Sequence, residues 1–347
     1  MNKFLKFFFL LIASVLIVSC AKEDKNTAEP LRDYAEQYTK DIVAIDTYLD
    51  DHYMNVDVNY NVTFTKIPLN GTQQSIRQQS LYPVEFINVT NDFQNVNYKL
   101  YYIKLREGTQ KKPSEVDSVH VAYRGNLLTD VQFDYSQNPL WFELQNVVPG
   151  WGEIIPKFKT GFYDATEGPD PVNFENYGAG IMFLPSAYGY YANSSPSGTI
   201  AAYSPLVFSF KLMELRYKDH DRDGILSKDE ADPANPTKKL IDYDSDSASS
   251  NDGLANLYDV DDDDDKVLTR NEIVQYVDPI TGKKHLYTFN GAATDNPTTP
   301  WDERQGIPRA FTGPVNSNGL KTPLPSDFTD PTRLRRHLDK NCKPPYL

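Results

Sequence analysis

The residues best suited to chemistry in this chain are carboxylates that recur at every second position. Asp219, Asp221 and Asp223 alternate with other residues, Gly224 follows directly, and Glu230 is twelfth counted from Asp219. Carboxylates at positions 1, 3, 5 and 12, with glycine at position 6 for a sharp turn, are the pattern of a twelve-residue loop that binds Ca²⁺. A merely solvated loop would not need the glycine and the glutamate there. The predicted ligands are Asp219, Asp221, Asp223, Ile225 through its carbonyl, Ser227 directly or through water, and Glu230.

A second copy of this pattern runs from Asp261 to Glu272. Lys266 takes the place of the turn glycine, and a left-handed lysine costs about 1 to 2 kcal/mol, so we expect a weaker site. The ligands predicted here are Asp261, Asp263, Asp265, Val267, Thr269 and Glu272. Between the copies, the strings DYDSD and NDGLANLYDVDDDDD resemble thrombospondin type 3 repeats, in which aspartates share several calcium ions. Because a strand is expected before the first loop and prolines follow it, the expected role of Ca²⁺ is a structural clamp rather than a sensor.

A set of aromatic residues forms the second candidate site, because its spacing fits neither a helix nor a strand. A core stripe would repeat every 2 or about 3.6 residues. The irregular spacing therefore predicts that the rings come from separate elements and converge on one place. The set comprises Tyr123, Phe133, Phe142, Trp151, Tyr188 and Phe208.

Five ordered strings in this region resemble those of FKBP-type peptidyl-prolyl isomerases. They read VHVAYRG, QFDYS, FELQNVVPGW, FLPSAYGY and LVFSFKLMEL and lie between Val119 and Leu215, roughly a third of the chain. The resemblance implies an α+β fold in which a curved antiparallel sheet wraps a short helix. It also implies roles for individual residues. Trp151 would lie under a prolyl ring, with walls formed by Tyr123, Phe142, Val147, Val148 and Phe208.

The same resemblance assigns the polar contacts of the pocket. Phe133 and Ile200 would line the carbonyl side, and the Tyr188 hydroxyl and the Val148 N–H would bond ligand carbonyls. Asp134 would contact the pocket tyrosine. Rotation about an X-Pro bond has a barrier of about 18 to 20 kcal/mol because the twisted amide loses resonance. A catalyst needs to bind the twisted amide best, so we expect no nucleophile, no covalent intermediate and no cofactor for catalysis.

The N-terminus has the features of an export signal. Lys3 and Lys6 precede an apolar run from Phe7 to Val18, which is too short for a spanning helix of about 20 residues. The string IVSC, ending at Cys20, resembles a bacterial lipobox, whose cysteine is acylated with chains such as palmitate. The chain is therefore predicted to be a lipoprotein of the bacterial cell envelope, expected at the outer membrane. A periplasmic and a cell-surface orientation both stay open, as do an uncleaved anchor and an ordinary signal peptide in which Cys20 is incidental.

The charge of the chain excludes one class of partner. The formal net charge is −13, and residues 219–272 hold seventeen acidic against six basic side chains. A chain this acidic repels phosphate backbones, so nucleic acid is not an expected partner. Of the two cysteines, Cys20 is assigned to lipidation, which leaves Cys342 without a disulfide partner.

These patterns divide the chain into five segments. Residues 1–19 are the signal peptide, and 20–95 hold a tether, an amphipathic helix from Ala28 to about His52 and a β-rich region. Residues 96–216 are the isomerase-like domain, which begins with a half-buried strand at Val96 to Leu105. Residues 217–277 are the acidic calcium-binding loops, and 278–347 an irregular tail. The helix either packs on its own domain or forms a homodimer.

Three functions fit this organisation. The first is a peptidyl-prolyl isomerase that acts on proline-containing, exported polypeptides, with calcium stabilising a loop-rich C-terminal extension. The second is a chaperone or scaffold that binds proline segments without catalysis. The third is a calcium-dependent surface interaction protein.

Overall fold

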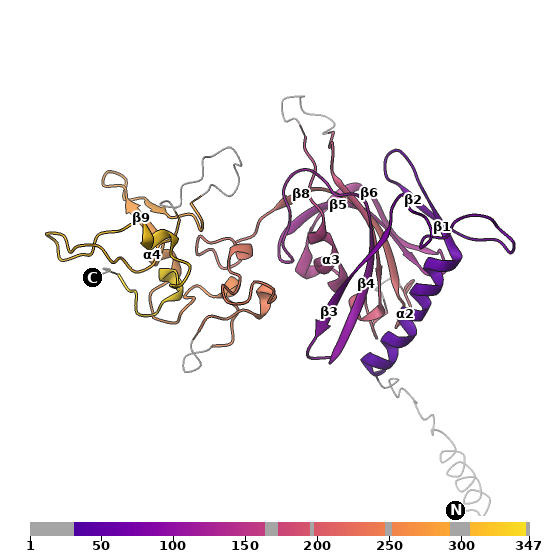
Figure 1. Cartoon of the computed structure of the whole chain (residues 1–347), viewed down its shortest axis with the longest axis horizontal. Coiled ribbons are helices and arrows are strands. Elements are labelled where there is room, and N and C mark those ends of the chain that lie inside the picture. The colour runs from indigo at the N-terminus through magenta and orange to yellow at the C-terminus, as the bar shows by residue number, and fades with distance from the viewer. Residues whose placement is uncertain (1–30, 164–172, 195–197, 247–251, 292–305, 345–347) are drawn as a thin grey trace, which may run out of the picture.

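A computed structural model describes residues 31–163, 173–194, 198–246, 252–291 and 306–344 of this chain. These residues form two bodies that lie side by side (Figure 1). The first body holds the helices α2 and α3 and the large sheet, and the second, the C-terminal body (residues 217–344), consists mainly of loops. The signal peptide and Cys20 lie outside the described residues. No helix in the described part of the chain has the length and apolarity needed to cross a bilayer.

A six-stranded antiparallel sheet is the frame of the first body. Its order is β3-β4-β7-β8-β5-β6. The strands are β3 (Val84–Asn91), β4 (Val96–Arg106), β5 (Ser118–Leu127), β6 (Gln132–Glu143), β7 (Gly178–Leu184) and β8 (Leu206–Arg216). Because β3 pairs with β4 along its whole length, the boundary predicted at residue 96 cuts this sheet, and the domain begins at least as early as Val84.

Both faces of the sheet are covered, which explains the alternating side chains of β4. Tyr98, Leu100 and Tyr102 belong to one apolar core together with the short helix α3 (Pro149–Ile154). Tyr101 and Ile103 belong to a second core, together with the helix α2. The strand predicted to be half-buried is thus buried on both sides, because the long helix covers the face that would otherwise meet water. Figure 1 shows α2 and the curved sheet packed together.

The helix α2 (Tyr34–Asp51) begins later than the predicted Ala28. Asp33 is its N-cap, and its carboxylate accepts a hydrogen bond of 2.9 Å from the Glu36 N–H. Such a cap satisfies an N–H that has no partner within the helix. The buried face includes Ile45, Tyr48 and Leu49, which pack on the chain's own sheet. The helix therefore packs on its own domain, and a homodimer formed through it stays a prediction.

Two small hairpins lie outside the large sheet in the described part of the chain. β1 (His52–Val56) pairs with β2 (Val62–Lys66), in agreement with the β-rich region predicted after the first helix. In the C-terminal body, β9 (Val274–Val277) pairs with β10 (Lys284–Leu286). The other short elements of that body are η4 (Ser227–Asp229), η5 (Leu240–Asp242), η6 (Asn256–Tyr258), α4 (Thr269–Glu272), α5 (Ser326–Thr329) and η8 (Arg336–Leu338).

The C-terminal body has a small apolar core. Ile225, Ile273 and Ile307 form one cluster, with Leu286, Tyr287 and Phe289 packed against it. The segment predicted to be an irregular tail contributes Ile307 to this core, and its buried Asp327 accepts hydrogen bonds from the N–H groups of Thr312 and Leu324. A body with so few apolar contacts needs additional stabilisation such as disulfides or bound metal.

Polar and apolar contacts join the two bodies. Val116, just before β5, packs with Leu240, Ala255 and Leu257. The backbone N–H of Lys218 donates to Asp117 over 3.0 Å, and the Lys218 ammonium lies 2.6 Å from the Glu143 carboxylate. The C-terminal body therefore follows β8 without a flexible linker.

A buried histidine in the C-terminal body predicts a dependence of stability on pH. Burial, with the charges of Arg335 and Arg336, lowers the pKa of His337 to about 3. In the unfolded chain a histidine has a pKa near 6.5. Below pH 6.5 the unfolded state therefore binds a proton that the folded state does not, and the free energy of unfolding falls as the pH is lowered. We expect the wild-type free energy of unfolding, relative to a His337→Gln variant, to fall by about 2 kcal/mol from pH 7 to pH 5. Urea unfolding of both proteins across this range measures the difference, and a pH-independent difference would contradict the expectation.

Candidate functional site

An aromatic cluster centred on Trp151 lies between α3 and the sheet. Its ring centroid is 5.3 Å from that of Tyr123, 5.5 Å from that of Phe142 and 5.4 Å from that of Phe208. Each pair is close to perpendicular, with interplanar angles of 77°, 70° and 86°. Edge-to-face geometry is preferred because the positive ring edge meets the negative ring face. These residues, predicted from separate segments, therefore converge on one place.

Different elements position the rings. Tyr123 lies on β5, Phe142 on β6, Phe208 on β8 and Trp151 in α3. Trp151 is 3% exposed and Phe208 4%, whereas Tyr123 and Phe142 are only half-buried. The cluster thus combines a buried floor with rings that are partly open to solvent.

Gly125 makes room for the ring of Phe133. A Cβ at Gly125 would lie 2.4 Å from Phe133 Cζ, closer than real Cβ atoms approach, and 3.0 Å from Phe208 Cε1, which is a tight contact. Phe133 and Phe208 meet at 5.4 Å and 89°. The glycine is needed for the close approach of these rings rather than for its backbone angles.

A polar pair lies at the edge of the cluster. The Tyr123 hydroxyl donates a hydrogen bond of 2.7 Å to Asp134 Oδ2, and Asp134 Oδ1 accepts one of 2.8 Å from the Tyr135 N–H. Burial, followed by the bond to Asp134, raises the pKa of Tyr123 above its usual value. The phenol therefore stays neutral, and the exposed carboxylate gives the cluster a charged edge.

Two loops bring the remaining predicted residues to the cluster. Tyr188 lies in the turn η3 (Ser186–Tyr188), is 4% exposed, and meets Tyr98 edge to face at 5.1 Å. Ile200 is 2% exposed in the same core, and Val147 and Val148 pack against it. Val148 caps α3, and its carbonyl accepts the Trp151 N–H over 3.0 Å.

The helix α2 holds the turn that carries Tyr188. Asp41, 2% exposed, accepts hydrogen bonds from the Ser186 N–H (2.8 Å) and hydroxyl (2.5 Å) on one oxygen. Its other oxygen accepts a bond of 2.7 Å from the Gln37 amide. Burial raises the pKa of Asp41, and the bonds to Ser186 and Gln37 oppose that rise.

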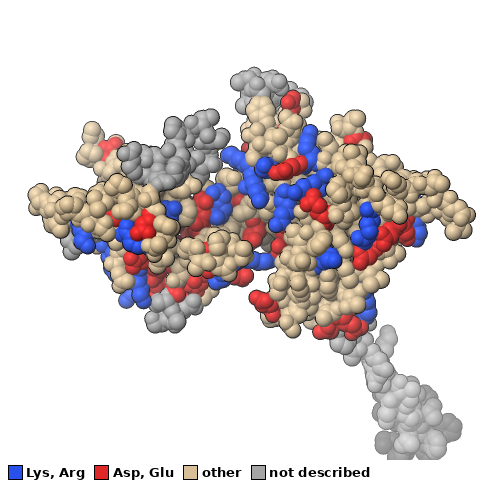
Figure 2. Space-filling model, viewed as in Figure 1, with Lys and Arg blue, Asp and Glu red and all other residues tan. Residues whose placement is uncertain are grey.

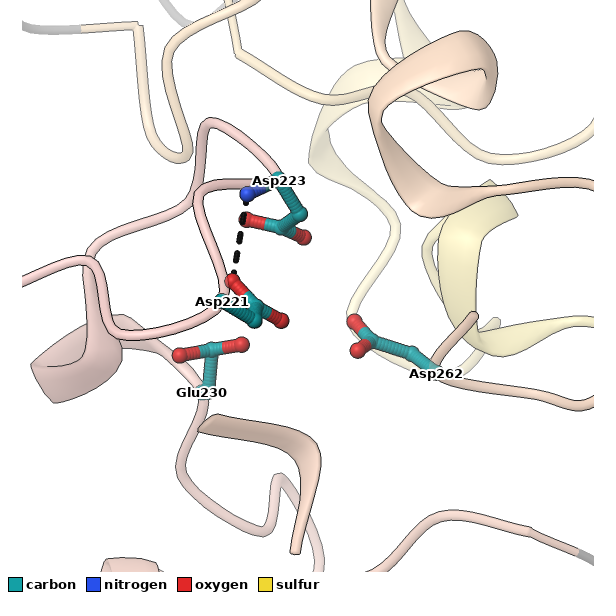
Figure 3. A group of neighbouring side chains, drawn as sticks. All are labelled: Asp221, Asp223, Glu230 and Asp262. Atoms are coloured by element: carbon teal, nitrogen blue, oxygen red, sulfur yellow. Dashed lines mark hydrogen bonds between the residues drawn. The ribbon is translucent and has the colours of Figure 1, made fainter. Parts of the chain in front are cut away.

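The acidic loops form a second group of sites. Asp221, Asp223 and Glu230 of the first loop lie with Asp262 so that one oxygen of each is within 4.8 Å of the others. In Figure 3 the three loop carboxylates stand on one side and Asp262 faces them from the other. Asp223 donates its N–H to Asp221 Oδ1 over 3.1 Å, and Gly224 has φ +107°, which glycine adopts readily.

These carboxylates are buried instead of solvated. Asp223, Glu230 and Asp262 are 2%, 5% and 1% exposed. Burial and the neighbouring carboxylates raise the pKa of Asp223 to about 8 and that of Glu230 to about 10, and raise the pKa of Asp262 far above its usual range. On the side of the molecule drawn in Figure 2, acidic and basic residues are interspersed and do not form one broad acidic surface. Buried carboxylates without cationic partners are costly, so the cluster suits a bound cation.

The second loop forms a separate group. Asp261, Asp263 and Asp265 meet within 4.8 Å, and Lys266 adopts φ +74°, as its place in the loop predicts. The Lys343 ammonium, from the end of the chain, lies 3.4 Å from Asp265 Oδ2. A lysine at this distance competes with a bound cation, which adds to the expectation of a weaker site. A third group consists of Asp246, Asp252 and Asp259, within the thrombospondin-like strings.

Some predicted ligands lie outside these groups. Asp219 and Glu272 do not belong to these groups, in which one carboxylate oxygen of each residue lies within 4.8 Å of those of all the others. Glu272 is nevertheless fully buried, and burial, followed by the charges of Asp263 and Asp265, raises its pKa to about 9. The Ser227 hydroxyl accepts a hydrogen bond from the backbone N–H of His220, the second residue of the first loop. The Thr269 hydroxyl accepts one from the backbone N–H of Asp262, the second residue of the second loop. Ile225 and Val267 donate their N–H groups to Asp223 and Asp265.

Comparison with known proteins decides the class of the aromatic site. Residues 109–213 match the family described as FKBP-type peptidyl-prolyl cis-trans isomerase. All ten predicted pocket residues fall within this match. This segment is similar to FKBP-type isomerase domains. A second family, described as BamM C-terminal, matches residues 220–301, which include the acidic loops.

Curated relatives share the isomerase domain. The probable FKBP-type isomerase FkpA of Neisseria meningitidis is 33% identical over 91 residues, which are 25% of this chain and 34% of that protein. FkpA of Aeromonas hydrophila is 31% identical over 127 residues, 36% of this chain and 41% of that protein. The chain thus spans less than half the length of these relatives. Among solved structures, FkpA of Escherichia coli aligns with 26% identity over 37% of this chain and 51% of that chain, at a TM-score of 0.27.

The sequence predicted that the aromatic residues converge on one place, which the structure confirms, but it gave no sign of three other features. Asp262 is the second residue of the second loop, and the second position of a twelve-residue calcium loop does not supply a ligand to that loop's own ion. Asp246, Asp252 and Asp259 lie in strings that suggested calcium without identifying a ligand set. Asp41 lies in an amphipathic helix, where a polar residue gives no signal that it is buried.

Proposed function

We propose that this chain is a lipid-anchored peptidyl-prolyl cis-trans isomerase of the bacterial cell envelope that acts on proline-containing exported polypeptides. The observation that carries the proposal is the cluster of Tyr123, Phe142 and Phe208 around Trp151 in the matched segment. Acylation at Cys20 would tether the protein, since two or more acyl chains hold a protein stably at a bilayer.

The site is suited to rotation about an amide bond. The substrate prolyl ring would lie on Trp151 between Tyr123 and Phe142, with the Tyr188 hydroxyl and the Val148 N–H bonding substrate carbonyls. An apolar surround removes water from the carbonyl and favours the twisted amide, which has lost its resonance and carries less charge on oxygen. The bond from Tyr123 to Asp134 fixes the ring that would contact the proline.

For the C-terminal body we propose a structural role for Ca²⁺. Oxygen ligands alone, supplied mainly by carboxylates, are the ligand set that calcium prefers. The ions would neutralise three groups of converging carboxylates and hold loops that have little apolar core. Chemistry at the proline does not require the ion.

The isomerase proposal is tested by adding full-length protein without its signal peptide to an X-Pro peptide and following cis-to-trans conversion. We expect acceleration by the wild type and a loss of about tenfold in kcat/KM for Tyr188→Phe, which removes one hydroxyl worth about 1.4 kcal/mol in the transition state. A Tyr135→Phe variant, on the exposed side of β6, serves as the control and should retain full activity.

The outcomes are distinct. Equal loss in both variants would show that the hydroxyl of Tyr188 has no specific role. No acceleration by a folded wild-type protein would contradict catalysis and favour a protein that binds proline segments without turnover.

A further inference from the structure

Asp262 is the most unusual acidic residue outside the predicted ligand sets. It is 1% exposed, and neither of its carboxylate oxygens has a hydrogen-bond partner within the described residues. A buried carboxylate without a partner is strongly unfavourable. Its side chain points at Asp221, Asp223 and Glu230 (Figure 3). The arrangement is therefore incomplete without a positive charge at the centre of these four groups.

The corresponding residue of the first loop behaves differently. His220 and Asp262 both stand second in their loops, and the backbone N–H of each donates to the hydroxyl at position nine, over 3.2 Å to Ser227 and 3.1 Å to Thr269. The His220 ring turns back, and its Nδ1 lies 2.9 Å from the same Ser227 hydroxyl. Asp262 instead extends away from its own loop. The two loops thus have similar local frames, but only the second sends a carboxylate to the other loop.

We propose that Asp262 is a ligand of the divalent cation held by the first loop, so that one ion joins the two acidic loops. The proposal rests on the proposed binding of Ca²⁺ by the C-terminal body and adds a ligand that the spacing of neither loop provides. Four carboxylates then surround the ion, and in calcium sites affinity rises with the number of charged ligands. We expect this to be the tightest of the three sites.

The shared ion would act as a cross-link. Asp221 and Asp262 are separated by a segment that contains η5 and η6, so a common ion closes this segment into a loop. Closing a loop restricts the unfolded chain and stabilises the folded state. The same segment carries Leu240, Ala255 and Leu257, which pack against Val116 of the isomerase domain. The ion would therefore also stabilise the contact between the two bodies.

The test is calorimetric titration of CaCl₂ into metal-free full-length protein, for the wild type and Asp262→Asn. Asparagine has the same shape but lacks the charge, and it relieves repulsion in the metal-free protein, so the variant should fold. The matched control is Asp264→Asn, an exposed position two residues away that belongs to none of the three groups. Loss of a charged ligand should weaken the tightest binding event by at least about tenfold, while Asp264→Asn leaves it unchanged.

A third variant identifies the loop that shares the ion. Glu230→Gln, in the first loop, and Asp262→Asn should weaken the same binding event, and their effects should not add in the double variant, because both remove ligands of one ion. Asp263→Asn should instead weaken a different, weaker event and add to Asp262→Asn.

Each outcome decides between the proposals. If the wild type binds no calcium, both the structural role of Ca²⁺ and the shared ligand are wrong. If the wild type binds calcium and Asp262→Asn binds it equally well, only the shared ligand is wrong. If the effects of Asp262→Asn and Glu230→Gln simply add, Asp262 acts at a distance and is not a ligand of the same ion.

Discussion

Removal of divalent cations is expected to unfold the C-terminal body while the six-stranded sheet stays folded. Without a cation, the converging carboxylates of the acidic loops repel one another, and the body has only the small core around Ile273 to oppose this. An ion present at a hundredfold excess over its Kd stabilises by about 2.7 kcal/mol per site. For a body of this size each site then corresponds to a shift in melting temperature of about 10 °C or more.

Differential scanning calorimetry with and without EDTA measures this effect. In calcium we expect one transition or two overlapping ones, and in EDTA an early transition that belongs to residues 217–344. Near-ultraviolet signals from Trp151 and isomerase activity should persist between the two transitions, since the aromatic cluster lies in the other body. A melting profile that EDTA leaves unchanged would exclude a structural role for the ion. MgCl₂ added in place of CaCl₂ is the specificity control, because Mg²⁺ binds all-protein carboxylate sites reluctantly.

Replacing Asp41 with alanine is expected to reduce both stability and isomerase activity. Asp41 is the only partner that the structure gives, within its described residues, to the Ser186 hydroxyl, and it also accepts the Ser186 N–H. Each buried polar group left without a partner costs about 1 to 3 kcal/mol, so we expect a loss of about 2 to 5 kcal/mol in the free energy of unfolding. Because Tyr188 follows two residues later in the same turn, its hydroxyl should lose its position.

The matched experiment separates positioning from general destabilisation. Asp41→Asn keeps an oxygen for Ser186 and should restore most of the activity, whereas Glu36→Ala, on the exposed side of the same helix, should change unfolding by less than about 0.5 kcal/mol. At a temperature where Asp41→Ala is fully folded, we expect its kcat/KM to be about tenfold lower than that of the wild type. Full activity of folded Asp41→Ala would show that α2 supports the fold without orienting the pocket.

The convergence of the aromatic residues was predictable because its signal is carried by an ordered set of local strings. Each string includes a ring and the strand or turn that positions it, so Trp151, Phe142 and Phe208 could be assigned before any geometry was known. The start of the domain was not predictable in the same way. β3 has a mixed polar and apolar sequence, and only its register with β4 shows that it belongs to the sheet.

The acidic loops show where a local pattern stops being informative. The spacing predicted that Asp221, Asp223 and Glu230 converge, and they do. It also predicted the left-handed backbone conformation of Lys266. It gave no sign of Asp262, because that residue's partners lie in a loop far away in sequence. Contacts of this kind depend on how two loops pack, which no spacing rule within one loop contains. For the same reason, the burial of Asp41 could not be read from the periodicity of its helix.

The direct connection between β8 and the acidic loops has a mechanical consequence. β8 is hydrogen-bonded to β5 along its whole length and to β7 from Leu206 to Leu212. A force applied to the C-terminal body would reach the sheet through this strand and load many hydrogen bonds at once, in shear. Breaking bonds together requires far more force than breaking them one after another. Tension on the C-terminal body should therefore disrupt its loops before it disturbs Phe208.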